Sequence, residues 1–252
     1  MRKSAIFSSI LIYKKIYILY MKIFNEFGIN PTTNYTAAGW DFYIPNIKLS
    51  PEESDFIFES FANSYKKSVE ELNDLLNSLV LTASAIYGEE RVEGNEMNIL
   101  LLYCMLDSPF KLDDDPIGTF VEDFLIFDEK GTPGISPEPL DQVNINSGIH
   151  VALNPGTVGV FLNKSGKGIK GWDIRAQVID EDYAGCVHCS LAYTKNNLED
   201  GIIYCGDKIT QMLVWNLEPK KPIKNMTKED YYEAMKNSQR GSNAFGSSDE
   251  KH

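Results

Sequence analysis

The chain contains few of the residues that form disulfides or bind transition metals, and few basic residues for its size. Only 4 of its 252 residues are cysteine and 3 are histidine. Four cysteines are too few for a disulfide framework in a chain of this length, so we expect a reducing, cytoplasmic compartment. The 24 lysine and arginine residues face 36 aspartate and glutamate residues, a net charge of −12. That balance argues against a nucleic-acid-binding protein, which needs a broad basic surface, but it allows a small phosphate ligand where cations or a metal gather locally.

Long hydrophobic runs are also missing. Residues 1–20 place Arg2 and Lys3 ahead of an apolar run, but Lys14 and Lys15 divide that run. Neither half approaches the ~20 apolar residues that a membrane span needs, and no small-residue cleavage site follows. We therefore expect a dispensable extension, or a start codon upstream of Met21, and no membrane partner. A membrane anchor is the alternative reading of this segment.

The middle of the chain has helical periodicity. Ser50–Glu53 reads as a capping box, and the apolar residues behind it recur at spacings of three and four, which predicts one helix to about Val80. A second helix is predicted over Glu96–Leu106. A third is predicted from Asp115, with Phe120, Phe124 and Phe127 as its apolar positions. The acidic run Asp113–Asp115 is interpreted as a cap of the third helix and not as a metal site. The apolar positions of the first helix are Phe58, Phe61, Tyr65, Val69, Leu72, Leu76 and Leu79.

The two ends of the chain have the character of β-strands. Short segments rich in branched and aromatic residues, separated by turns, predict a closed or sandwiched antiparallel fold. We therefore expect a β domain of residues 21–49 and 141–226, interrupted by a helical insertion of residues 50–140. Residues 227–252 are predicted to hold a short helix and a polar tail. The predicted strands after the insertion are 143–153, 158–162, 172–179, 187–193 and 211–217.

Two short motifs suggest sites that their context does not support. Gly166–Gly171 matches the dinucleotide-binding pattern G-x-G-x-x-G, but a strand-like segment follows where a helix would hold the pyrophosphate. Cys186 and Cys189 have the C-x-x-C spacing of a zinc site. On a strand these two side chains point to opposite faces, so two buried strand residues are the better interpretation.

Five segments in chain order resemble the sequence motifs of one protein family, and we call them the family-like segments. They are Ala37–Phe42 (AAGWDF), Lys164–Gly166 (KSG), Gln177–Gly185 (QVIDEDYAG), Gly206–Leu213 (GDKITQML) and Arg240–Ser248 (RGSNAFGSS). They resemble, in the same order, the five motifs of the trimeric dUTPase (deoxyuridine 5'-triphosphate nucleotidohydrolase) family. Any one match is weak, whereas five in order are a strong signal. The resemblance implies a mainly β fold, a dUTPase-like β-clip or jelly-roll-type barrel, here interrupted by an α-helical insertion.

The resemblance also implies an activity. Members of the family hydrolyse dUTP to dUMP and pyrophosphate with Mg²⁺, which lowers dUTP and supplies dUMP for dTMP synthesis. Asp180 is expected to activate the water that attacks the α-phosphorus. Three subunits surround each site in this family, so a homotrimer is expected, in the host cytoplasm if the protein is phage-encoded.

The roles implied for the other site residues follow the family motifs. Asp41 and Gln211 would hold Mg²⁺ through water, and Tyr183 would lie against the deoxyribose. Lys164 stands where the family usually has arginine, which exchanges a two-pronged donor for a point charge. Gln177 replaces a common glycine, so the reading of the base there is less certain. The full set of expected substrate-binding residues is Lys164, Ser165, Gly166, Gln177, Val178, Ile179, Tyr183, His188, Gln211, Arg240, Phe245, Gly246, Ser247 and Ser248.

Two other functions remain as alternatives. Some phage members of the family carry insertions that dock regulatory proteins, so the helical insertion is a candidate surface for a protein partner, with hydrolysis secondary. A cap that widens the trimer interface is the simpler interpretation. A dCTP deaminase of the same superfamily is the other alternative, although Glu181 is not in an obvious position for a deaminase's catalytic glutamate.

Overall fold

The computed structural model describes residues 21–33, 38–48, 54–218 and 226–237. The chain divides into two compact units, residues 1–217 and 218–252. The second unit contains helix α9 (Lys228–Asn237). Within the described ranges, none of the helices combines the length and the apolar character needed to cross a bilayer. The N-terminal segment 1–20 lies outside these ranges, so the expectation for it stays a prediction.

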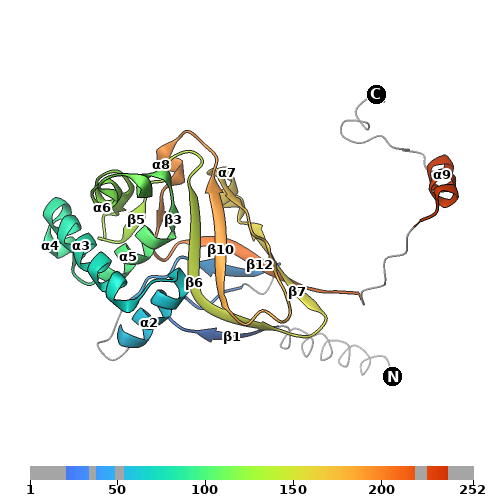
Figure 1. The fold of residues 1–252 in the computed structure, drawn as a ribbon, viewed down its shortest axis with the longest axis horizontal. Coiled ribbons are helices and arrows are strands. Elements are labelled where there is room, and N and C mark those ends of the chain that lie inside the picture. The colour runs from blue at the N-terminus through green and yellow to red at the C-terminus, as the bar shows by residue number, and fades with distance from the viewer. Residues whose placement is uncertain (1–20, 34–37, 49–53, 219–225, 238–252) are drawn as a thin grey trace, which may run out of the picture. The chain divides into compact units, whose positions relative to one another are not determined.

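The first unit is built mainly on antiparallel sheets, as expected (Figure 1). One sheet has the order β1 (Met21–Asn25), β6 (Gln142–Leu153), β10 (Cys186–Tyr193) and β8 (Trp172–Ile174), and β3 (Leu106–Asp107) also pairs with β6. The long strand β6 is thus paired along most of its length. Its buried apolar side chains that belong to the hydrophobic core are Val143, Ile145, Ile149 and Val151.

The second sheet carries most of the family-like segments. Its order is β2 (Trp40–Tyr43), β12 (Lys208–Asn216), β7 (Thr157–Asn163) and β9 (Val178–Ile179). Phe42 of β2 and Phe161 of β7 are fully buried and meet edge to face at 5.2 Å between ring centroids. Aromatic pairs of this geometry stabilise a core beyond the area that they bury. The core therefore fixes β2 and β7 on either side of β12.

The strand predicted over residues 172–179 is wrong as a single element. It divides into β8, which pairs with β10, and β9, which pairs with β7 in the other sheet. Arg175 N still donates to Ser190 O of β10 at 2.8 Å, whereas Gln177 O accepts from Phe161 N of β7 at 2.7 Å. The chain therefore crosses from one sheet to the other within three residues. Periodicity does not reveal this crossing, because it is set by long-range pairing.

The single long helix predicted from the first capping box is also wrong. Two helices occur, α2 (Ser54–Tyr65) and α3 (Val69–Tyr87). Lys66 has a φ of 54°, a left-handed conformation that ends α2. Ser68 then caps α3, because its Oγ accepts from Glu71 N at 3.1 Å while Glu71 Oε2 accepts from Ser68 N at 2.7 Å. The predicted capping box at Ser50–Glu53 lies outside the described residues.

The rest of the insertion combines helices with a small sheet. The second predicted helix is confirmed as α5 (Glu96–Met105), which follows the short α4 (Glu89–Val92). The third begins as predicted after Asp115, whose Oδ1 accepts from Gly118 N at 3.0 Å, so the cap interpretation is confirmed. It ends early, and Phe127 lies on a strand. The remaining elements of this region are η1 (Pro109–Leu112), α6 (Pro116–Thr119), the π-helical turn η2 (Phe120–Phe124), β4 (Leu125–Phe127) and β5 (Pro133–Ile135). Later in the chain follow α7 (Ser165–Ile169), α8 (Leu198–Gly201) and β11 (Ile203–Tyr204). Strands β11, β5 and β4 form a three-stranded sheet.

The insertion shares a continuous hydrophobic core with the β-sheets. Helix α5 is almost wholly buried, and Asn98 is a polar residue within it that is 1% exposed. The Asn98 side chain accepts from Ile47 N at 2.7 Å and donates to Ile47 O at 3.1 Å. This pair of hydrogen bonds ties the insertion to the segment that follows β2. Residues on both sides of the predicted boundaries, 50 and 140, pack together. These boundaries of the insertion stay a prediction.

We expect Asn98→Ala to lower the free energy of unfolding by roughly 2–4 kcal/mol, because it leaves both buried backbone groups of Ile47 without a partner. Denaturant unfolding at fixed protein concentration measures the change. Asn77→Ala, at an exposed position of α3, is the matched control and should change stability by less than about 0.5 kcal/mol. Equal small effects from the two substitutions would contradict this role of Asn98.

Candidate functional site

Three of the predicted site residues meet on the second sheet. Asp41 of β2 and Gln211 of β12 are directly paired, and the neighbouring Thr210 pairs with Asn163 at the end of β7. Lys164 follows immediately, and its Nζ lies 2.5 Å from Asp41 Oδ1. Segments that are more than a hundred residues apart in sequence are thus brought to one end of this sheet.

A second cation also reaches Asp41. Lys208 Nζ lies 3.1 Å from Asp41 Oδ2, so each carboxylate oxygen faces one ammonium group. Burial alone would raise the pKa of Asp41, but the hydrogen bonds and charges of Lys164 and Lys208 outweigh it and hold that pKa below its ordinary value. The hydrogen bond to Asp41 in turn raises the pKa of Lys208. The carboxylate is therefore ionised and locally neutralised at neutral pH.

The sequence analysis did not identify Lys208 as a site residue. On a regular strand Lys208 and Gln211 would point to opposite faces, because they are an odd number of positions apart. The pairing of β12 with β2 shifts register between Lys208 and Thr210, which is a β-bulge. The extra residue returns Lys208 to the face of Asp41. A sequence signal did exist, since Lys208 occupies the basic position of the fourth family-like segment.

Asp41 and Gln211 fit a Mg²⁺ ion that is held through water. Oxygen ligands are those that Mg²⁺ prefers, and it usually keeps several of its waters. Both oxygens of Asp41 are already hydrogen-bonded to lysines, which disfavours direct coordination. The Gln211 amide nitrogen faces Asn163 O at 3.4 Å, so its amide oxygen is the end left to accept from water. These contacts are compatible with the expected arrangement and do not test it.

The predicted phosphate-binding residues Ser165 and Gly166 are exposed at the start of α7, directly after Lys164. An ion pair of 2.7 Å between Lys167 Nζ and Asp207 Oδ2 joins α7 to the turn before β12. Strand β8 follows α7 directly. The rejection of a dinucleotide site at this glycine motif is therefore supported by the geometry, because no long helix follows it.

Asp180 lies at the opposite end of the sheet from these groups. It follows β9, which pairs antiparallel with the first half of β7 through Ile179 and Gly159. Lys164 follows the other end of β7, five residues beyond Gly159. At about 3.3 Å per strand residue, the separation along the sheet is roughly 16 Å. One chain therefore does not bring Asp180 to the cluster of Asp41, Lys164 and Gln211.

Asp180–Gly185 lies between two apolar strand-like segments, and this pattern predicts a hairpin tip or a tight turn. Strands β9 and β10 flank the turn but belong to different sheets and do not pair with each other. Asp180, Glu181 and Asp182 are exposed, and Tyr183 N donates to Asp180 O at 3.1 Å. The hairpin interpretation is wrong because the chain changes sheets here, although the turn itself is confirmed. Val178 and Ile179 pair with β7, which also engages the carbonyl of Gln177.

Tyr183 and His188 line an open pocket of about 390 Å³. The Tyr183 hydroxyl donates to Cys186 O at 2.6 Å, which holds the ring across the start of β10. Burial raises the pKa of Tyr183 and lowers the pKa of His188, so His188 is neutral at pH 7. Helix α2 of the insertion contributes to the same pocket, which the sequence gave no reason to expect. The other lining residues are Glu26, Ser60, Asn63, Ser64, His150 and Cys186.

The remaining predictions concern cysteines and the C-terminal arm. Cys186 and Cys189 are both buried residues of β10, as predicted. Arg240, Phe245, Gly246, Ser247 and Ser248 lie outside the described residues, so their roles stay predictions.

Comparison with known proteins agrees with the family-like segments. A family model described as dUTPase matches residues 134–249. The Gag-Pro-Pol polyprotein of Simian retrovirus SRV-1 is 32% identical over 118 residues, which is 47% of this chain and 6% of the polyprotein. The Gag-Pro polyprotein of Mason-Pfizer monkey virus is 31% identical over 118 residues, which is 47% of this chain and 11% of the polyprotein. The chain thus spans only a small part of these curated relatives.

Solved structures of phage dUTPases are also similar. A mutant of the Staphylococcus bacteriophage 80alpha dUTPase with dUpNHpp has a TM-score of 0.46 and 13% identity, over 90% of this chain and 97% of that chain. A mutant dUTPase of the S. aureus phage phi11, whose structure describes a structural Mg(II) ion, has a TM-score of 0.32 and 17% identity, over 38% and 79% of the two chains.

The region matched by the family model contains the second to fifth family-like segments and, with them, β7, β9 and β12 of the second sheet. The first segment, with Asp41, lies outside the match but pairs directly with the fourth segment in the sheet. Residues 134–249 are therefore similar to the dUTPase family.

Proposed function

We propose that the protein is a Mg²⁺-dependent dUTP diphosphatase, which converts dUTP to dUMP and pyrophosphate and so lowers dUTP and supplies dUMP for dTMP synthesis. The observation that carries this proposal is the convergence of Asp41, Gln211 and Lys164 on one end of the second sheet. These residues come from three separate family-like segments. A chance resemblance in sequence gives no reason for the three segments to meet in space.

This end of the sheet supplies local positive charge in a chain of net charge −12. Lys164 and Lys208 hold Asp41 at 2.5 and 3.1 Å, and both side chains end at the surface, 28% and 48% exposed. Flexible ammonium groups can turn from a carboxylate to the phosphates of a nucleotide. Asp41 and Gln211 would then hold Mg²⁺ through water, and the bound ion would neutralise phosphate charge. Ser165 and the Gly166 N–H are positioned next to Lys164 to donate to the same phosphates.

The exposed turn after β9 supplies the expected base. Asp180 orients a water and takes its proton as the water attacks the α-phosphorus, and pyrophosphate leaves. A carboxylate does this when the water lies within hydrogen-bond reach. Tyr183 holds the deoxyribose, where its ring occupies the space of a 2′-hydroxyl. The backbone of Val178 and Ile179, with β10 near His188, reads uracil.

The spacing of these groups favours a site that is built from more than one copy of the chain. Within one chain the Asp180 end and the Lys164 end of β7 lie roughly 16 Å apart, so Asp180 does not adjoin the Asp41 cluster. A complete site therefore takes Asp180 from one subunit and the Asp41 cluster from another. A closed threefold ring provides such an exchange at every interface, so we propose a homotrimer, with Arg240 and Phe245 of the C-terminal arm closing over the nucleotide.

The activity is tested by following pyrophosphate release from each nucleoside triphosphate. We expect selective hydrolysis of dUTP. In Asp180→Asn the turnover should fall by about 10²- to 10⁴-fold with little change in KM, because the base is lost while the binding contacts remain.

Asp182→Asn is the control for this substitution, because Asp182 is an exposed acid of the same turn. It should retain wild-type turnover. Wild-type turnover in Asp180→Asn would overturn the role of that residue, and ammonia release from dCTP would identify a deaminase instead. Equal hydrolysis of UTP would contradict the role of Tyr183.

The shared site is tested by mixing two inactive variants, Asp180→Asn and Lys164→Ala, through co-expression. In randomly mixed trimers about a quarter of the sites combine an intact Asp180 with an intact Lys164 from a different chain, so activity should return. The double variant Asp180→Asn/Lys164→Ala, mixed with either single variant, is the matched control and should stay inactive. An inactive mixture of the two single variants, with mixed oligomers verified by mass spectrometry, would contradict a site built across subunits.

A further inference from the structure

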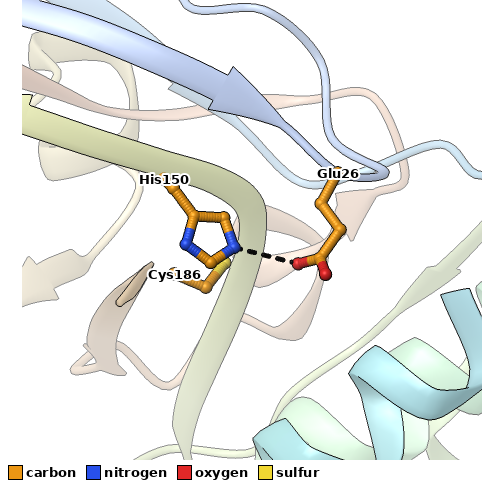
Figure 2. A group of neighbouring side chains, drawn as sticks. All are labelled: Glu26, His150 and Cys186. Atoms are coloured by element: carbon orange, nitrogen blue, oxygen red, sulfur yellow. Dashed lines mark hydrogen bonds and ion pairs between the residues drawn. The ribbon is translucent and has the colours of Figure 1, made fainter. Parts of the chain in front are cut away.

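We propose that Glu26, His150 and Cys186 form a binding site for a borderline-soft divalent cation of the Zn²⁺ type. The three side chains point toward one another (Figure 2), and their ligand atoms all lie within 4.8 Å of one another. A carboxylate, an imidazole and a thiolate are the ligands of zinc sites. Mg²⁺ prefers oxygen alone. This site is separate from the Asp41–Gln211 pair and does not depend on the proposed hydrolysis.

The register of the first sheet holds these residues together. Cys186 of β10 is directly paired with His150 of β6, and Phe24 of β1 is paired with His150 on the other side. Directly paired residues point to the same face with Cβ atoms about 4.5–5.5 Å apart. Glu26 follows β1, where its backbone N–H donates to Gly148 O at 2.9 Å. The backbone pairing of β1, β6 and β10 therefore holds the three side chains close together.

The hydrogen bonds of His150 direct Nε2 toward Glu26. Its Nδ1 lies 3.2 Å from Ala184 O and its Nε2 lies 3.0 Å from Glu26 Oε2. A backbone carbonyl can only accept, so Nδ1 carries the proton of the first contact. The position between Nε2 and the carboxylate is then taken either by a second proton or by a cation in its place. A carbonyl that orients the second ring nitrogen is the usual support of a metal-binding histidine.

The Cys186 thiol lies in a buried, polar environment. Its Sγ donates to Asn146 Oδ1 at 2.8 Å, and the same oxygen accepts from Gly148 N at 3.0 Å. Burial raises the pKa of Cys186 to about 12, so the thiol is protonated in the absence of an ion. A cation that binds Sγ displaces this proton to the solvent, as metal binding to thiols requires.

The position of the site lets an ion enter and leaves room for a further ligand. All three residues line the open pocket of about 390 Å³ that also contains Tyr183 and His188. Three protein ligands with an open fourth position are typical of zinc sites that bind water or a small ligand. The side chains of Glu26 and His150 are 11% and 28% exposed, so the site is neither sealed nor fully solvated.

The test uses the full-length chain, stripped of metal with a chelator, and no nucleotide. Co²⁺ serves as the spectroscopic substitute for Zn²⁺. We expect one equivalent to bind, with a thiolate-to-cobalt charge-transfer band that Zn²⁺ displaces and Mg²⁺ does not. Glu26→Gln, which preserves shape, should weaken binding at least about tenfold, and His150→Ala should weaken it further.

Cys186→Ser should abolish the charge-transfer band, whereas Cys104→Ser, at a partly exposed free thiol of α5, should keep it. Circular dichroism verifies that each variant is folded. If Cys186→Ser does not fold, Glu26→Gln still tests the proposal. The absence of a band in the wild-type chain, its persistence in Cys186→Ser or its loss in Cys104→Ser would overturn the proposal.

Discussion

The antiparallel pairing of β7, with β12 on one side and β9 on the other, determines where the groups of the proposed active site lie. β12 brings Gln211 and Lys208 to Asp41, and the end of β7 adds Lys164. β9 runs the other way and carries Asp180 to the far end of β7. Within one chain the Asp41 cluster and Asp180 thus lie toward opposite ends of β7. The proposed chemistry therefore goes together with the proposed assembly of several chains.

The electrostatics of the Asp41 cluster follow from the same pairing. Lys164 would be the one lysine paired with Asp41 among the described residues if the bulge in β12 did not return Lys208 to its face. With Lys164 and Lys208 in place, the acid is ionised and its charge is balanced. Local cations of this kind allow an acidic protein to bind a nucleotide that carries several negative charges. The net charge of the chain therefore says little about the site itself.

The sequence predicts those parts of the fold that local patterns determine. The strands that became β6, β7, β10 and β12, the helix α5 and the cap at Asp115 all follow from periodicity and capping residues. The break between α2 and α3 was also signalled, since Ser68 and Glu71 form a second capping box, but the unbroken apolar spacing concealed it.

The crossing between β8 and β9 had no local signal, because only pairing with β10 and β7 separates them. The family resemblance named Asp41, Lys164 and Gln211, and the structure brings them together. It did not name Lys208, Glu26 or His150, whose positions depend on a bulge and on cross-strand register.

The helical insertion contributes more than a separate cap. Its helix α5 is part of the common core through Asn98 and Ile47, and its helix α2 lines the pocket of Tyr183 and His188 with Ser60, Asn63 and Ser64. A partner that binds the insertion, one of the alternatives raised by the sequence, would therefore act on a body that shares its packing with the sheets. The same pocket holds Glu26, His150 and Cys186, so a cation bound there would lie beside the residues expected to hold the nucleoside.

A crystal structure of the chain with Mg²⁺ and a non-hydrolysable dUTP analogue tests the central claim most directly. The account predicts that Asp180 of one subunit faces the α-phosphorus while Lys164 and Ser165 of a different subunit contact the phosphates of the same nucleotide. A nucleotide contacted by Asp180 and Lys164 of one and the same chain would contradict it, as would a bound nucleotide remote from Asp180.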